Sequence, residues 1–210
     1  MVAGVAPGSS TVTLVNASGG YLDIRPRGAF RTLFILYPGG LVRPQAYVWL
    51  GVALAPLGVR TVIPIFPFDL AVTDPERAAK LLPLAEGRPV FVGGHSLGGA
   101  MAARFALKYT ADLQGLILLG AYSAGSDDLS TLSLPTLVLA AQNDGLATLA
   151  DVRAGADRLP AGTRLTVIRG AVHSFFGRYG PQRGDGMPTV SRPEAERQIV
   201  QAIRQFLASR

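Results

Sequence analysis

Six residues that directly follow an apolar run constrain the fold of this chain more than any other feature. The segment Gly94-His95-Ser96-Leu97-Gly98-Gly99 comes after 89–93, which reads as a buried strand, and before 100–107, which has the alanine content and apolar spacing of an amphipathic helix. A strand that turns at once into a helix places Ser96 at the tip in a strained backbone conformation, and the glycines let the two elements approach closely. The pattern predicts an exposed serine hydroxyl at the end of a buried strand.

A serine hydroxyl becomes a strong nucleophile only beside a base, and the chain contains two histidines. His95 lies inside the turn next to Ser96, where the turn geometry keeps it from taking the serine proton. His173 follows the alternating run 165–168, which predicts a strand, and so lies on a loop at the carboxyl end of that strand. By elimination His173 is the predicted base.

The base needs a third group that orients its ring, and we expect this group after another strand. The apolar run 134–141 predicts a buried strand, and the turn 142–145 places Asp144 directly after it. Asp144 is therefore the predicted acid. Asp127 and Asp128, which follow the preceding predicted strand, remain alternatives.

Together these segments resemble the α/β-hydrolase superfamily, and within it the small bacterial members with little cap, of the dienelactone-hydrolase-like or esterase-like kind. The resemblance extends from Thr11 to Ala208 and includes 37–40, the Ser96 turn, the Asp144 turn and the His173 loop. The order serine, aspartate, histidine along the chain is that of the superfamily. Dienelactone hydrolases proper use a cysteine nucleophile, and this chain has no cysteine, so that activity is not implied.

Hydrolases of this kind stabilise the oxyanion of the reaction with two backbone N–H groups. One donor is expected to be Leu97, the residue after the nucleophile, which also opens a helix. The other is expected in the loop after the strand 32–37, where Pro38 replaces the His-Gly pair of many relatives. Proline has no N–H group to donate, so Gly40 is the predicted second donor and Leu41 the alternative.

The whole chain, 1–210, is predicted to form one α/β-hydrolase domain: a doubly wound, mostly parallel sheet of about eight strands with helices on both faces. Its composition, 49% hydrophobic and 16% charged, suits such a sheet. The turn 17–20 predicts an antiparallel hairpin at the start. The predicted strands lie near 11–16, 20–24, 31–37, 59–64, 88–93, 114–120, 135–141 and 164–169. The predicted helices lie near 44–57, 74–85, 97–109, 146–158 and 192–208.

The spacing of the elements also bears on the substrate. Only about 14 residues separate the strands 114–120 and 135–141, which leaves no room for a large cap domain. The loop 178–190 after the predicted base is either a small flap or an ordinary surface loop. Aromatic residues expected near strand ends predict an apolar rim for the substrate: Phe66, Phe68, Tyr122, Phe175 and Phe176.

The net charge of +6 and the pI near 10.2 do not indicate nucleic-acid binding, because the eighteen arginines and two lysines are scattered and no nucleic-acid motif is present. The uncharged stretch 44–59 is too short and too interrupted to span a membrane. Residues 1–20 lack a basic start and a sustained apolar core, so we expect no signal peptide and a cytoplasmic location. The absence of cysteine excludes thiolate metal sites and fits a reducing compartment.

The sequence thus predicts a serine hydrolase that cleaves small carboxylic esters through Ser96, His173 and Asp144 and needs neither a metal nor an organic cofactor. Its expected partner is a small-molecule ester. Two alternatives stay open. The same three residues serve a thioesterase, an amidase or an acyltransferase equally well, and the fold also occurs in binding proteins without catalytic activity.

Overall fold

A central sheet of eight strands organises the molecule, and a computed structural model describes it over residues 8–209. Residues 1–7 and 210 lie outside the described residues. They belong to the expected domain 1–210, and 1–7 also belong to the segment 1–20 in which we expect no signal peptide. The order across the sheet is β1-β2-β4-β3-β5-β6-β7-β8. The strands are β1 Ser10–Val15, β2 Tyr21–Pro26, β3 Thr32–Tyr37, β4 Val59–Pro64, β5 Val90–His95, β6 Gly115–Leu119, β7 Thr136–Ala141 and β8 Arg164–Ile168.

The sheet is mostly parallel, as the sequence predicts. Strands β1 and β2 form the predicted antiparallel hairpin, and β2 also pairs with β4 in antiparallel register. From β4 across to β8 every neighbouring pair is parallel. The carboxyl ends of these six strands therefore lie at one edge of the sheet, where ligands bind in folds of this type.

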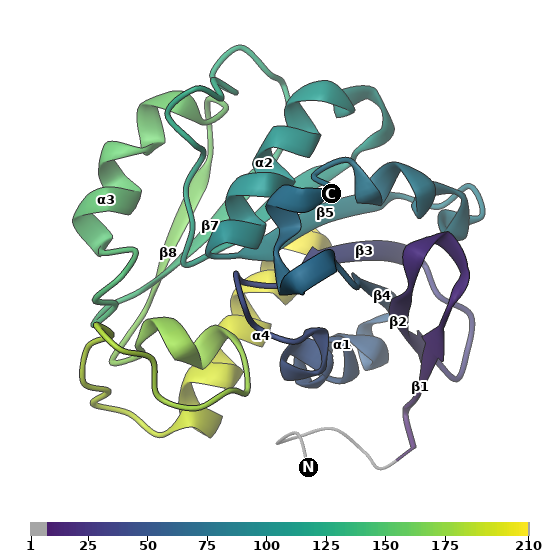
Figure 1. Cartoon of the computed structure of the whole chain (residues 1–210), viewed down its shortest axis with the longest axis horizontal. Coiled ribbons are helices and arrows are strands. Elements are labelled where there is room, and N and C mark those ends of the chain that lie inside the picture. The colour runs from purple at the N-terminus through teal and green to yellow at the C-terminus, as the bar shows by residue number, and fades with distance from the viewer. Residues whose placement is uncertain (1–7, 210) are drawn as a thin grey trace.

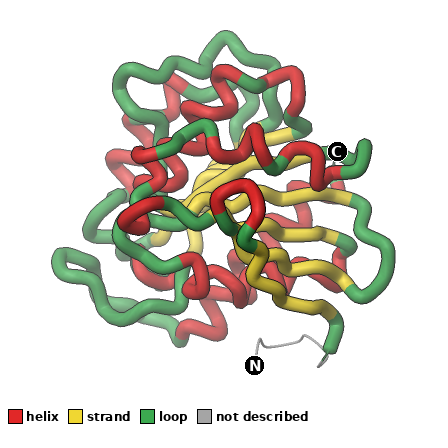
Figure 2. Tube along the Cα trace, turned by 45° about the vertical axis from the view of Figure 1, so that its right-hand side comes forward, coloured by secondary structure: helices red, strands yellow, loops and turns green. Residues whose placement is uncertain are grey.

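Helices cover both faces of the sheet (Figures 1 and 2). Helices α2 (Leu97–Lys108) and α3 (Leu149–Ala154) lie on one face, and α1 (Val48–Leu54) and α4 (Arg192–Ala208) lie on the other. The alternation of side chains along a strand fills both layers. In β3, for example, Leu33, Ile35 and Tyr37 point toward the core under α2, whereas Phe34 and Leu36 point toward the core under α1 and α4.

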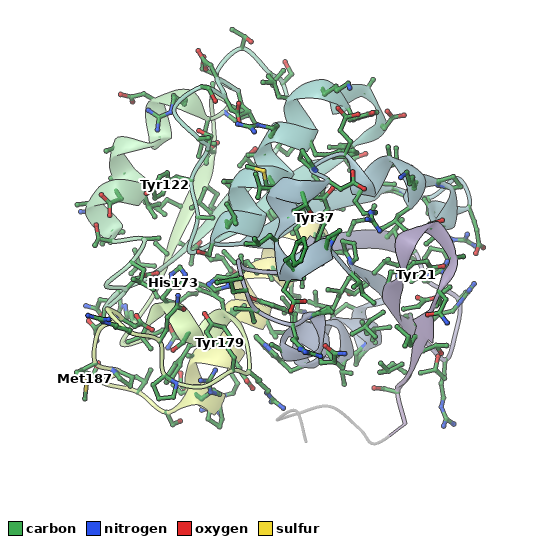
Figure 3. All side chains as sticks on the ribbon, in the orientation of Figure 1. Tyr21, Tyr37, Tyr122, His173, Tyr179 and Met187 are labelled. Carbon is green, nitrogen blue, oxygen red and sulfur yellow. The ribbon has the colours of Figure 1, made fainter. Side chains whose placement is uncertain are left out.

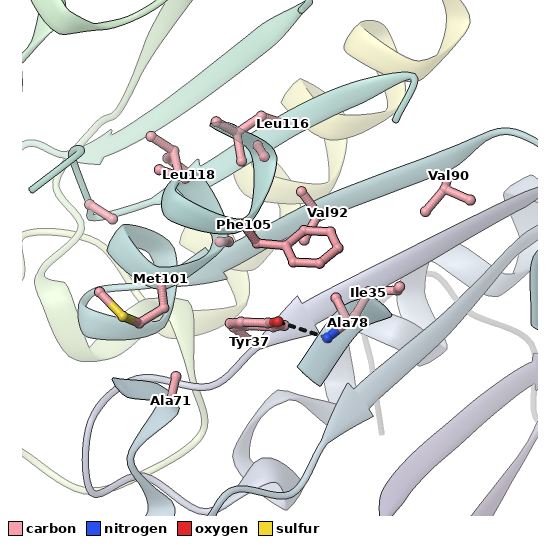
Figure 4. Packing of buried hydrophobic residues seen from close by; sticks show 14 of the residues in the cluster. Ile35, Tyr37, Ala71, Ala78, Val90, Val92, Met101, Phe105, Leu116 and Leu118 are labelled. Atoms are coloured by element: carbon pink, nitrogen blue, oxygen red, sulfur yellow. Dashed lines mark hydrogen bonds between the residues drawn. The ribbon is translucent and has the colours of Figure 1, made fainter. Parts of the chain in front are cut away.

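Figure 4 shows the core under α2, where Met101 and Phe105 of the helix pack against strand side chains. Tyr37 is fully buried there, and its hydroxyl accepts a hydrogen bond from the Ala78 N–H at 2.9 Å and donates one to the Pro75 carbonyl at 2.8 Å. This hydroxyl therefore fixes the 75–78 segment to the end of β3.

The helix predicted over 74–85 is wrong. The segment forms two short 3₁₀ turns, Arg77–Lys80 and Leu82–Ala85. Asp74 does not cap a helix, because its carboxylate accepts a hydrogen bond from the Arg77 guanidinium at 2.8 Å. Pro83 lies inside the segment, has no N–H group to donate and interrupts a regular helix.

The remaining helices are confirmed, with differences at their ends. The expected helix 44–57 consists of α1 between two 3₁₀ turns, and the expected helix 146–158 consists of α3 followed by one 3₁₀ turn. Helix α4 matches its predicted range, and the Ser191 hydroxyl accepts the Glu194 N–H at its start.

Residues 120–135 connect β6 to β7 without forming any helix or strand, so the chain carries no large cap. Over residues 8–209, the helices are all too short or too polar to cross a bilayer.

Candidate active site

Ser96 lies at the sharp turn between β5 and α2, as the sequence predicts. Its backbone has φ 53° and ψ −125°, a left-handed conformation that few residues other than glycine adopt. The turn is held by the Ser96 N–H, which donates to the Leu119 carbonyl of β6 at 3.1 Å. The glycines around it are required by close contact. A Cβ on Gly98 would overlap the Pro38 carbonyl oxygen, and one on Gly94 would overlap the Gly98 backbone.

His173 and Asp144 form a buried pair at the same edge of the sheet. Asp144 follows β7, His173 follows β8, and the distance from His173 Nδ1 to Asp144 Oδ2 is 2.7 Å. Both side chains are almost completely shielded from solvent, at 1% and 0% exposure. The other Asp144 oxygen accepts hydrogen bonds from the N–H groups of Leu146 and Ala147, each at 2.8 Å, so the carboxylate cannot rotate freely. Figure 3 shows His173 within this corner of the molecule.

The pairing fixes which nitrogen of His173 can act as a base. Because Nδ1 donates its proton to the Asp144 carboxylate, the neutral ring has its free lone pair on Nε2. Among the described residues Nε2 is buried and has no hydrogen-bond partner. It is therefore the atom available to accept a proton from a nucleophile.

The two alternative acids, Asp127 and Asp128, bind groups other than His173. The Asp127 carboxylate accepts hydrogen bonds from the Arg104 guanidinium at 2.9 and 3.3 Å and from Ser126. Asp128 is exposed and accepts the Ser130 N–H at 2.9 Å. The structure brings Asp144 to His173 and leaves Asp127 and Asp128 elsewhere on the loop after β6.

His95 lies against His173, with ring centroids 4.4 Å apart, but its environment differs. Burial lowers the pKa of His95 well below its usual range, and the adjacent His173 adds to the shift. Its Nδ1 is 2.8 Å from the hydroxyl of Tyr47. Burial raises the pKa of Tyr47, so this hydroxyl keeps its proton and donates it to His95. His95 is thus held as a neutral structural ring.

Tyr47 also contacts the loop after β3, a role that the sequence analysis missed. Its hydroxyl accepts the N–H of Gly39 at 2.9 Å. The side chain is completely buried, and a Cβ on Gly39 would come within 2.8 Å of both this hydroxyl and His95 Nδ1. No local pattern marks Tyr47, because it lies in a 3₁₀ turn before α1, 48 residues from His95.

The loop after β3 has one backbone N–H group, that of Gly40, that lies beside Leu97 and is not used by the loop itself. Gly39 donates to Tyr47, and the N–H of Leu41 donates to the Asp69 carbonyl at 2.9 Å. Gly40 lies next to Leu97, since a Cβ on Gly40 would be 3.0 Å from Leu97 Cδ2. Within residues 8–209, the N–H groups of Gly40 and Leu97 have no hydrogen-bond acceptor. These are the two groups that the sequence nominates for an oxyanion.

The predicted aromatic rim is only partly present at the surface. Phe66 is buried and packs against Tyr37, with the two ring centroids 5.0 Å apart. Phe176 is buried against His95, with the ring centroids 5.5 Å apart. Tyr122 and Phe175 are half-buried, and the guanidinium of Arg192 covers the Phe175 ring at 4.4 Å. Phe68, at 83% exposure, is the one of the five that is largely accessible. All five rings follow strands as expected, but two of them, Phe66 and Phe176, belong to the core.

The segment 178–190 is anchored to the site by hydrogen bonds. The Asn143 amide, next to Asp144, donates to the Met187 carbonyl at 3.0 Å. The Asp185 carboxylate accepts the His173 N–H at 2.9 Å. Figure 3 shows Tyr179 in the same part of the molecule as His173, and Met187 at the outer edge. The segment is thus joined by hydrogen bonds to the turn that carries Asp144 and to the loop that carries His173, in keeping with an ordinary ordered loop.

A sheet of this order, with a serine turn after β5 and a buried aspartate–histidine pair after β7 and β8, defines the α/β-hydrolase fold. A model of the alpha/beta hydrolase family matches residues 33–197. The chain therefore belongs to the alpha/beta hydrolase family. No curated protein matches it in sequence.

Two solved structures show the same fold. A predicted CIB-like hydrolase from Thermoplasma acidophilum superposes with a TM-score of 0.74 at 17% identity, covering 99% of this chain and 100% of that chain. An alpha-beta serine hydrolase homologue from Coxiella burnetii superposes with a TM-score of 0.63 at 22% identity, covering 80% of this chain and 91% of that chain. At these identities the likeness concerns the fold.

Proposed function

We propose that this protein is a serine hydrolase that cleaves small carboxylic esters through an acyl-enzyme intermediate. The observation that carries the proposal is the buried hydrogen bond between His173 Nδ1 and Asp144 Oδ2, 2.7 Å long, at the sheet edge where Ser96 occupies its left-handed turn. A buried carboxylate that orients a neutral imidazole is what a serine nucleophile requires of its base.

In the first half of the proposed reaction, Ser96 Oγ attacks the carbonyl carbon of the ester while His173 Nε2 takes the hydroxyl proton. The carbonyl oxygen becomes an oxyanion and accepts hydrogen bonds from the N–H groups of Gly40 and Leu97. Asp144 stabilises the imidazolium that forms. When the carbon–oxygen bond to the alcohol breaks, His173 returns its proton to the leaving alkoxide, and the acyl group stays on Ser96.

In the second half, a water molecule loses a proton to His173 Nε2 and attacks the acyl carbon. A second oxyanion forms at Gly40 and Leu97 and collapses, and the proton on His173 passes to Ser96 Oγ. The products are one alcohol and one carboxylic acid for each ester and water consumed, and the three side chains return to their starting protonation states.

The proposal is tested by labelling with a fluorophosphonate probe and by a matched panel of ester, thioester and amide substrates that share one acyl group. We expect stoichiometric labelling and the highest kcat/KM on the ester. A folded protein that resists the probe would support a binding protein instead. A preference for the thioester or amide would assign a different acyl-transfer reaction to the same residues.

Replacement of Asp144 by asparagine is expected to leave the fold intact and to lower kcat by about 10³- to 10⁴-fold. The amide NH₂ group can donate to the histidine ring and so favours the wrong tautomer, with the proton on Nε2. Steady-state kinetics checks the effect, and circular dichroism checks the fold. Asp127→Asn is the matched control, because that carboxylate binds Arg104 instead of His173. A larger loss in the Asp127 variant would reassign the acid.

The surroundings of the site support a small substrate with an apolar group. The connection 120–135 forms no cap that encloses a long chain. On the loops next to Gly40, Leu41 and Phe68 are 76% and 83% exposed, and the hydrogen bond from Leu41 N–H to the Asp69 carbonyl joins the two loops. Both residues have positive φ, at 59° and 56°, an unusual conformation for bulky apolar side chains.

We therefore expect a preference for short acyl esters, acetate to butyrate, over long-chain esters, and no activation at a lipid–water interface, because such activation needs a lid that opens. Hydrolysis rates for p-nitrophenyl esters of increasing chain length, below and above the solubility limit, measure both. Chelators should leave the rate unchanged, since the protein groups supply nucleophile, proton transfer and charge stabilisation. A preference for triglyceride emulsions, or loss of activity on chelation, would contradict this substrate range.

A further inference from the structure

We infer that Asp185 is a positioning residue for the proposed base, His173, a role that rests on the proposed function. Asp185 belongs to the segment 178–190 and does not touch the His173 ring in any described contact. Its carboxylate instead binds the backbone that carries the ring. The inference concerns how the base is held at its working position relative to Ser96 and Asp144.

Both oxygens of the Asp185 carboxylate accept hydrogen bonds from backbone N–H groups. Oδ1 accepts the N–H of His173 at 2.9 Å, and Oδ2 accepts the N–H of Ser174 at 2.9 Å. Oδ1 also accepts the N–H of Gly186 at 2.8 Å and lies 3.5 Å from the N–H of Gly145. One side chain therefore binds two successive residues, His173 and Ser174, of the loop after β8, which we call the base loop. It also reaches Gly145, the residue that follows Asp144.

The charge of this carboxylate is maintained by its donors. Burial alone would raise the pKa of Asp185, but the N–H groups of Ser174 and His173, the Ser174 side chain and the N–H group of Gly186 lower it below its usual range. Hydrogen bonds from N–H groups to an ionised carboxylate are stronger than bonds between neutral groups. The Asp185 carboxylate is thus ionised, and accepts these hydrogen bonds, throughout the neutral pH range.

The segment around Asp185 packs closely against the turn 142–145 that carries Asp144, which we call the acid turn. A Cβ on Gly145 would overlap the Gly184 carbonyl oxygen, and a Cβ on Gly186 would overlap the Asn143 carbonyl oxygen. The base loop and the acid turn come from different strands, β8 and β7. Asp185 and its flanking glycines set the relative position of these two loops, and the 2.7 Å contact between His173 and Asp144 depends on that position.

Asp185→Asn tests the inference with little change in volume. An amide has one oxygen and one NH₂ group, so in either orientation it turns a donor toward an N–H of the base loop. We expect kcat for ester hydrolysis and the rate constant for fluorophosphonate labelling to fall about 10- to 100-fold, because a small displacement of the base costs rate in the transition state. KM should stay unchanged, since the Asp185 carboxylate is occupied by backbone N–H groups. Measurements are made well below the melting temperature of each variant.

Asp128→Asn is the matched control. It removes the same charge from another loop carboxylate that accepts a backbone N–H, and it is expected to retain the kcat of the unmodified protein. Asp185→Glu is a second variant that keeps the carboxylate on a longer stem. It should recover part of the lost rate if the carboxylate holds the loop, and it remains informative if the asparagine variant does not fold.

A proton NMR signal gives a readout that does not depend on turnover. The proton between His173 Nδ1 and Asp144 is expected downfield of the backbone amides, and ¹⁵N-labelled histidine assigns it because the chain has only two histidines. We expect this signal in the unmodified protein and in Asp128→Asn, and its broadening or loss in Asp185→Asn.

The outcomes separate the inference from the proposed function. An unmodified protein that neither labels nor hydrolyses esters would refute the proposed function, while the NMR comparison would still report whether Asp185 positions His173. An Asp185→Asn variant with normal kcat and an unchanged Nδ1 signal would overturn the inference alone. A lower melting temperature with unchanged kcat, KM and NMR signal would show that Asp185 only stabilises the fold.

Discussion

Replacement of Ser96 by alanine is expected to abolish covalent labelling by a fluorophosphonate and to lower kcat by about 10³- to 10⁶-fold. Ser96 is the serine in the left-handed turn between β5 and α2, directly before Leu97, whose N–H group has no acceptor within residues 8–209. In the proposed reaction the Ser96 hydroxyl oxygen is the atom that becomes acylated, so without it no other group can complete the reaction by the same route. Gel-based labelling and steady-state kinetics measure the loss.

Two serines serve as controls for this substitution. Ser174 lies next to His173, and Ser123 is fully buried with no hydrogen-bond partner for its hydroxyl among the described residues. Ser174→Ala and Ser123→Ala should both retain labelling. Labelling that survives in Ser96→Ala and maps by mass spectrometry to Ser174 or Ser123 would overturn the assignment of the nucleophile.

Replacement of His173 by alanine is expected to cost nearly as much activity as the loss of Ser96, because the members of a catalytic triad act as a unit. Without the Nε2 lone pair, the Ser96 hydroxyl has no acceptor for its proton and remains a weak nucleophile. His95 cannot replace His173, since its Nδ1 accepts the hydrogen bond from Tyr47 and its Nε2 then carries the proton of the neutral ring. A His173 variant with near-normal turnover would show that another group is the base.

The same assignment predicts the pH dependence of the unmodified protein. A base must be neutral to accept a proton, so kcat/KM should fall as the pH is lowered and the base becomes protonated. A single ionisation is expected, because burial holds the pKa of His95 well below the usual histidine range and His95 stays neutral. A pH–rate profile measures it. Two ionisations between about pH 5 and 8 would contradict the roles given to the two rings.

Much of the fold and of the candidate site could be predicted because the signals are local. Strand β5 and helix α2 follow from apolar periodicity, and the glycines between them follow from the close backbone contact at the turn. The aspartate and histidine could be nominated because parallel strands bring their carboxyl ends to one edge. The contact of 2.7 Å between His173 and Asp144 then selects Asp144 over the aspartates after β6.

Local signals were misleading where packing decided the outcome. Asp74 followed by proline suggests a helix start, but Asp74 pairs with Arg77, and Pro83 interrupts the segment. Phe66 lies directly after a strand and was expected to face the substrate, yet it packs edge-on against Tyr37. Whether such a ring faces the core or the solvent depends on the loop conformation, which its sequence position does not specify.

The sequence by itself determined the fold class, the serine turn and the nomination of the histidine and aspartate, because periodicity and turn chemistry act between near neighbours in the chain. The tertiary structure alone decided that Tyr47 binds Gly39 and His95 and that Asp185 binds the base loop. These are hydrogen bonds from side chains to groups 8 to 48 residues away. They require donors and acceptors about 3 Å apart, a distance that only the packed arrangement of the loops establishes.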